Sequence, residues 1–100
     1  MISAEDLRKL LSAGKSLEDV SFAGSKLSDE EFKGADFSGL DLTKVDFAGS
    51  DLTGAIFAGA DLPEADFNEA NLTDADLTNV TGVGTDFTHA TIEGAALTGG

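Results

Sequence analysis

Large apolar residues recur at every fifth position along most of the chain. From residue 17 to residue 97, sixteen of the seventeen positions in this series hold Leu, Phe or Ile, and only Gly82 interrupts it. All seven Phe residues fall in the same series. An amphipathic helix repeats about every 3.6 residues and a strand about every 2. A period of five therefore indicates neither a simple helix nor a simple strand.

The residues around each apolar centre also follow a pattern. The position two before it is mostly small and apolar, as in Ala35, Ala55 and Ala75, and the position between is usually Asp. In a short extended segment, the centre and the residue two before it point to the same side, and the Asp points to the other. The two remaining residues must turn the chain, and Gly is frequent there because it tolerates positive φ. This pattern predicts a solenoid in which stacked coils bury one continuous core.

The alternation of Phe and Leu constrains the number of sides in each coil. From residue 37 to residue 72 the centres alternate strictly between these two types. A coil with an even number of sides places Phe above Phe and Leu above Leu, whereas three sides would mix them. Spacing alone does not distinguish two sides from four.

The segments ADFSG, ADLPE, ADFNE, ANLTD and ADLTN share an A(D/N)LXX pattern, which resembles the pentapeptide-repeat family. The resemblance covers roughly residues 15–100. It implies an all-β fold, a right-handed quadrilateral parallel β-helix with four pentapeptides per coil and about four coils.

Residues 1–14 do not follow the repeat, so we divide the chain into a helical segment, 1–14, and a solenoid, 15–100. Ser3 and Asp6 have the spacing of a capping box. A single apolar stripe follows, made of Leu7, Leu10 and Leu11. We expect a short α-helix over about residues 4–13 that caps the N-terminal end of the core.

Two departures from the repeat have local consequences. Glu30 occupies an inward position, and burial of an unpaired carboxylate is costly. We therefore expect residues 28–32 to be distorted or Glu30 to reach solvent. At Gly82, either a small void forms or the chain slips and turns Val83 inward.

The sequence shows no second cap at its C-terminal end, which stays in phase with the repeat. Phe87, Ile92 and Leu97 should therefore lie near an open end with unpaired edges. Members of the family that the sequence resembles commonly dimerise through this end, and we expect a homodimer through the C-terminal coil.

The net charge of −13 is unevenly distributed. All six Lys and Arg residues lie at or before Lys44, whereas ten acidic residues follow it. With four sides per coil, Asp46, Asp66 and Asp86 stack in one outward column, with Glu69 nearby. This surface should repel nucleic acid and anionic membranes, and it could attract a basic protein surface. The plainer interpretation is that charge of one sign keeps an edge-rich β-protein soluble.

The sequence contains few of the residue types that commonly act in catalysis. It has one His, His89, and no Cys, Tyr or Trp. Nucleophilic triads and His-based metal sites need partners that are missing. We predict no catalytic residues, no cofactor and no metal. No apolar run approaches membrane-spanning length, and charges interrupt the N-terminus where a secretory signal would be apolar. A cytoplasmic location is the default expectation.

Two functions follow from these features. The first is a non-catalytic protein-interaction or structural module whose partner the sequence does not identify. The alternative comes from the resemblance: some pentapeptide-repeat proteins are similar to DNA in shape and charge, bind DNA gyrase and confer quinolone resistance. An acidic mimic of DNA that binds gyrase or another topoisomerase would use Asp46, Asp66, Glu69 and Asp86.

Overall fold

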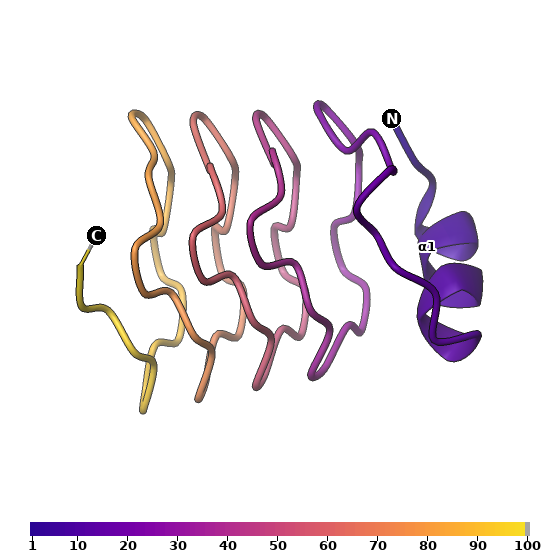
Figure 1. Cartoon of the computed structure of the whole chain (residues 1–100). Coiled ribbons are helices and arrows are strands. Elements are labelled where there is room, and N and C mark those ends of the chain that lie inside the picture. Colours follow the sequence, from indigo (N-terminus) through magenta and orange to yellow (C-terminus); the bar gives the residue numbers. More distant parts are fainter. Residues whose placement is uncertain (100) are drawn as a thin grey trace.

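We analysed a computed structural model of the chain, which describes residues 1–99. The helix α1 spans Ala4–Ser12. Ser3 forms its N-cap, because the Ser3 hydroxyl accepts a hydrogen bond from the Asp6 N–H at 3.1 Å. The remainder of the described chain is a β-helix, in which isolated parallel bridges replace long strands. Figure 1 shows its stacked coils with α1 at one end.

The bridges fix four pentapeptides per coil. Each bridge joins a residue to the one 20 positions later, from Lys26 and Asp46 at the first bridge to Asp76 and Ala96 at the last. Hydrogen bonds run across each bridged junction in a regular way; for example, Phe57 N–H donates to the Asp76 carbonyl at 2.7 Å. Of the two even numbers that the sequence left open, the structure has four.

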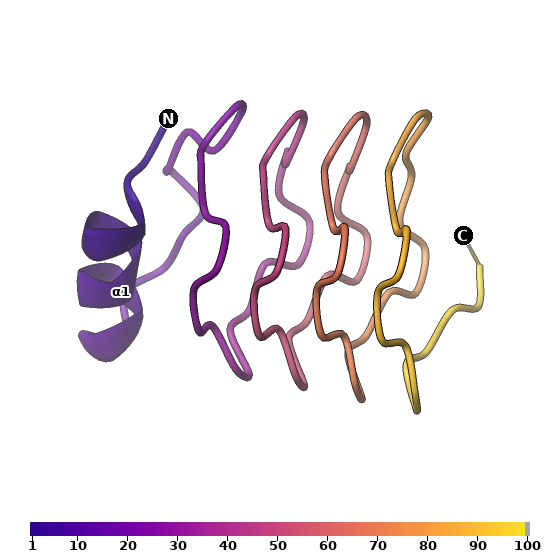
Figure 2. The ribbon, with the colours of Figure 1, turned by 180° about the vertical axis from the view of Figure 1, so that it is seen from behind.

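The apolar centres and the residues two before them form the core. Phe37, Ala55 and Phe57 are all fully buried. The Phe residues stack as the alternation predicted, because Phe37 lies over Phe57 and Phe47 over Phe67, with ring centroids 5.2 Å apart in both pairs. Figures 1 and 2 show the stacked coils from opposite sides.

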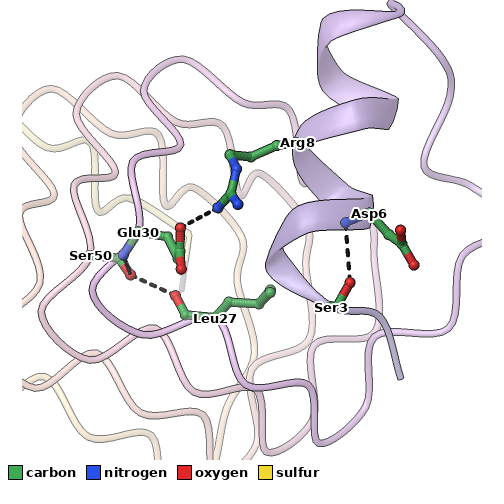
Figure 3. Close-up of polar contacts among 6 residues, drawn as sticks. All are labelled: Ser3, Asp6, Arg8, Leu27, Glu30 and Ser50. Carbon is green, nitrogen blue, oxygen red and sulfur yellow. Dashed lines mark hydrogen bonds and ion pairs between the residues drawn. The ribbon is translucent and has the colours of Figure 1, made fainter.

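Contacts between α1 and the first coil explain how Glu30 is accommodated (Figure 3). Arg8 of α1 pairs with the Glu30 carboxylate, which remains about a third exposed. The Glu30 N–H donates to Ser50 Oγ, and this hydroxyl in turn donates to the Leu27 carbonyl at 2.6 Å. The expected distortion of residues 28–32 is wrong, since Glu31 keeps its regular bridge to the next coil. The alternative, that Glu30 reaches solvent, describes the structure.

The chain keeps its register past Gly82. Thr81 and Asp86 form regular bridges on either side of it, and Val83 is 86% exposed. The expected inward turn of Val83 is therefore wrong. The Thr85 hydroxyl takes up the space beside Gly82, where it donates to the Leu62 carbonyl at 2.6 Å. A polar side chain thus compensates for the missing apolar centre.

Candidate protein-interaction surfaces

The C-terminal end of the solenoid is an exposed apolar surface. We define the C-terminal face as Leu77, Val80, Phe87, Ile92 and Leu97, which line a cavity of about 300 Å³. Phe87, Ile92 and Leu97 are 39%, 47% and 54% exposed. Their equivalents one coil earlier are almost completely buried. The burial that the repeat provides elsewhere is therefore missing on this face.

The backbone edge of the same face is also open. One coil earlier, Phe67 N–H donates to the Asp86 carbonyl and Leu72 N–H donates to the Thr91 carbonyl, both at 2.7 Å. Among residues 1–99, the equivalent N–H groups of Phe87 and Ile92 have no backbone partner. The C-terminal face thus combines apolar side chains with an unpaired strand edge, which favours association.

The predicted acidic column is present in the structure. Asp46 forms a bridge with Asp66, and Asp66 forms one with Asp86, so the three residues lie one above the other. Glu69 is exposed at a corner with φ of 63°. Each Asp also accepts a hydrogen bond from the backbone N–H two residues later, at 2.8–2.9 Å. These carboxylates therefore stabilise the corners of their own coil as well as forming a charged surface.

The same turn holds several Asp side chains in their ionised form. Hydrogen bonds from the hydroxyl and N–H of the Ser or Thr two residues later lower the pKa of the carboxyl group. The affected residues are Asp36, Asp41, Asp51, Asp76 and Asp86. At Asp51 the Lys33 ammonium group, 3.5 Å away, adds to the lowering. The acidic surface therefore keeps these charges well into acidic solution.

This lowering predicts a pH-dependent contribution to stability. A carboxyl with a lowered folded pKa stabilises the fold above its unfolded pKa of about 4, and this stabilisation is lost as pH falls through the folded pKa. We expect Asp41→Asn/Asp51→Asn to unfold at lower urea concentration than the wild type at pH 6, and the difference to shrink at pH 3. High salt in both measurements screens the repulsion among the many acidic side chains.

Glu69→Gln/Glu93→Gln is the control for this experiment, because it removes the same charge from side chains that form no such turn. Its difference from the wild type should be small at both pH values. A difference for Asp41→Asn/Asp51→Asn that stays constant between pH 6 and pH 3 would contradict the prediction.

The described residues contain no group of three or more His, Cys, Asp or Glu side chains placed to hold a metal ion. His89 is exposed at a corner with φ of 58°. Within the same residues, no helix has the length and apolar character needed to cross a membrane.

The repeat is also found by comparison with protein families. The sequence matches the profile of pentapeptide repeats, in eight copies, over residues 16–54, 46–81 and 65–99. The chain belongs to the pentapeptide repeat family. This confirms the resemblance seen in the A(D/N)LXX segments, and the right-handed β-helix that it implied.

Solved structures of other pentapeptide repeat proteins are similar to this one. A protein from the thylakoid lumen of Arabidopsis thaliana is 40% identical, with a TM-score of 0.71, over 72% of this chain and 50% of its own. HetL, involved in heterocyst differentiation regulation in the cyanobacterium Nostoc sp. strain PCC 7120, is 26% identical, with a TM-score of 0.74, over 78% of this chain and 37% of its own.

A third similar structure is that of QnrB1, a plasmid-mediated fluoroquinolone resistance protein. It is 30% identical, with a TM-score of 0.58, over 71% of this chain and 42% of its own. No curated protein sequence matches the chain significantly. This pentapeptide repeat protein thus spans half or less of the length of these three proteins.

Proposed function

We propose that this pentapeptide repeat protein is a non-catalytic protein-interaction module that binds a second copy of itself through the C-terminal face. The observation that carries the proposal is the exposure of Phe87, Ile92 and Leu97 around an apolar cavity, next to an unpaired strand edge. We further propose that the chain divides into a capping helix, 1–14, and a solenoid of about four coils, 15–100. Residue 100 lies outside the described residues.

The two ends of the solenoid differ, and this difference favours a closed dimer. At the N-terminal end, Leu7 of α1 is fully buried against the core. At the other end, the apolar C-terminal face can meet the same face of a second copy, related by a two-fold axis. Such an interface would cover the C-terminal face of both copies.

Light scattering tests this proposal directly. We expect a solution mass of twice the 10.2 kDa of the chain at micromolar concentration. A mass of one chain at every concentration examined would refute self-association. The proposed module would then have to use another surface. A cytoplasmic location remains part of the proposal, with no nucleic-acid or membrane partner.

The second candidate function is an acidic mimic of DNA that binds DNA gyrase or another topoisomerase. Its support is the column of Asp46, Asp66 and Asp86, the absence of basic residues after Lys44, and the similarity to a fluoroquinolone resistance protein. A dimer would double the length of this column. The described chain itself measures only 29 × 21 × 19 Å.

Gyrase supercoiling assays distinguish this candidate from the first. We expect micromolar protein to inhibit supercoiling if the column replaces DNA, and Asp46→Asn/Asp66→Asn/Asp86→Asn to lose the effect. The control Asp51→Asn/Asp61→Asn/Asp76→Asn removes the same charge from other columns. Supercoiling that is unaffected by the wild type would exclude gyrase as the partner.

A further inference from the structure

The first coil departs from the backbone pairing of the others. Residues 15–23 form no bridge with residues 35–42, although the spacing of 20 would place them side by side. Pairing resumes only where Gly24 N–H donates to the Thr43 carbonyl at 2.9 Å. In Figure 1 the dark purple chain that follows α1 leaves the regular stack and runs toward the helix. Two strand edges are therefore separated at this end of the solenoid.

Both of these edges carry unpaired backbone groups. On the edge of 35–42, the N–H and carbonyl groups of Asp36 and Asp41 have no backbone partner within residues 1–99. On the facing edge, the N–H groups of Leu17 and Phe22 likewise have no backbone partner in the described part of the chain. At the equivalent outward positions from Asp46 to Ala96, the N–H and carbonyl groups all pair with the preceding coil. Each edge can therefore form hydrogen bonds with an additional strand.

A cleft of about 800 Å³ lies between the two edges, and we call it the N-terminal cleft. Three apolar side chains that are only partly buried line it: Leu11, Val20 and Leu40. Four charged residues also line it: Lys15, Glu18, Asp36 and Asp41. With three acidic side chains and one basic side chain, the cleft favours a positively charged occupant.

The segment on the outer side of the cleft is held at both ends. At its start, Lys15 N–H donates to the Leu10 carbonyl of α1 at 3.0 Å. At its end, Ser25 Oγ accepts from Ile2 N–H at 2.8 Å. Between these points the Leu17 and Phe22 side chains are 6% and 2% exposed. Closing the cleft would require these buried side chains and the contacts with Leu10 and Ile2 to move together.

We infer that the N-terminal cleft binds an extended peptide of a protein partner, with basic residues five positions apart and a small apolar residue on either side of each. The peptide adds a strand between residues 15–23 and 35–42, which is a common mode of peptide recognition. Its basic residues lie opposite Asp36 and Asp41, and its apolar residues contact the side chains that line the cleft. The inference rests on the proposed function only in that both make the chain a protein-binding module.

The regular part of the solenoid provides a template for this arrangement. Lys26 forms a parallel bridge with Asp46, so a basic residue already lies opposite an acidic one at the equivalent position of the next junction. Opposite charges on facing strands attract each other. A suitable probe is the fluorescein-labelled decapeptide AKVSGAKVSG, which has the period of the solenoid and a Gly at the corner.

Fluorescence anisotropy with the full chain tests the charge requirement. Asp36→Asn/Asp41→Asn removes two charges and keeps the turns, as Asn71 shows by accepting from Thr73 N–H at 3.0 Å. We expect this variant to bind the peptide about fivefold more weakly. Asp61→Asn/Asp76→Asn makes the same change on the same two sides of later coils and should bind like the wild type. Equal weakening in both variants, or no binding at all, would overturn the inference.

Amide hydrogen exchange tests the backbone pairing. The N–H groups of Asp36 and Asp41 should exchange faster than those of Asp61 and Asp66 in the free protein, and at least tenfold more slowly once the peptide is bound. Slow exchange of these two N–H groups in the free protein would show that residues 15–23 and 35–42 pair with each other. That result would overturn the inference.

Cysteine pairs provide an independent readout, since the chain has no native Cys. Under mild oxidation, Lys26→Cys/Asp46→Cys should form a disulfide readily, and Ser21→Cys/Asp41→Cys should not. Rapid formation of both disulfides would again show a closed cleft. Peptide binding is also measured in Leu97→Glu, the variant designed to disrupt the proposed dimer. The experiment thus tests peptide binding to the cleft separately from self-association.

Discussion

Replacing Phe57 with alanine is expected to lower the free energy of unfolding by about 3–5 kcal/mol, because it removes a large buried side chain and leaves a cavity. Phe57 is fully buried. Its ring stacks on Phe37 and meets Phe47 and Phe67 edge-on, with centroids 5.2–5.8 Å apart. The loss is a large part of the total stability of a small domain. Urea unfolding, followed by circular dichroism, measures it.

Ile56→Ala is the matched control, because Ile56 is the adjacent residue and points outward with 36% of its surface exposed. We expect it to cost about 1 kcal/mol or less, since partial exposure removes much of the transfer term and no enclosed cavity forms. Similar losses for the two variants would mean that the Phe columns do not dominate the stability of the solenoid.

Leu97→Glu is expected to convert the proposed dimer into a monomer at micromolar concentration. Leu97 is 54% exposed on the C-terminal face and lines its cavity. In a two-fold interface each substitution occurs twice, and two carboxylates would lose water without a basic partner. The expected loss of affinity is more than a hundredfold, which light scattering over a dilution series detects.

Val83→Glu tests whether added negative charge alone has this effect. Val83 lies in the same final coil but points outward, with 86% of its surface exposed. This variant should remain a dimer. Dissociation of both variants would indicate general repulsion, and dissociation of neither would place the interface away from the C-terminal face.

The sequence predicted the features that depend on which side chains are buried. The period of five and the alternation of Phe and Leu identify inward positions, and the structure buries Phe37, Leu42 and Phe47 completely. The number of sides was not predictable from this alternation, because any even number satisfies it. The bridges between residues 20 apart provided the missing information.

The N-terminal cleft is not predicted by the hydrophobic pattern. Leu17 and Phe22 fit the repeat and are buried as the repeat requires. Their backbone is nevertheless unpaired with residues 35–42. Hydrophobic patterning indicates which side chains are buried. It carries little information on whether the backbones of neighbouring coils form hydrogen bonds. For the same reason, the acidic column was visible in the sequence, but the partner that it would bind was not.

The bridge spacing also determines which sequence rearrangements this architecture tolerates. A tandem duplication of 20 residues would add one complete layer and leave every outward column aligned with its neighbours. A duplication of five residues would keep all apolar centres inward but rotate everything after it by a quarter turn. Placed between Asp46 and Asp66, such an event would separate Asp46 from Asp66 and Asp86, and it would also stack Leu on Phe where Phe now stacks on Phe. A step of 20 residues thus preserves both the outward columns and the Phe columns of the core, whereas a step of five changes both.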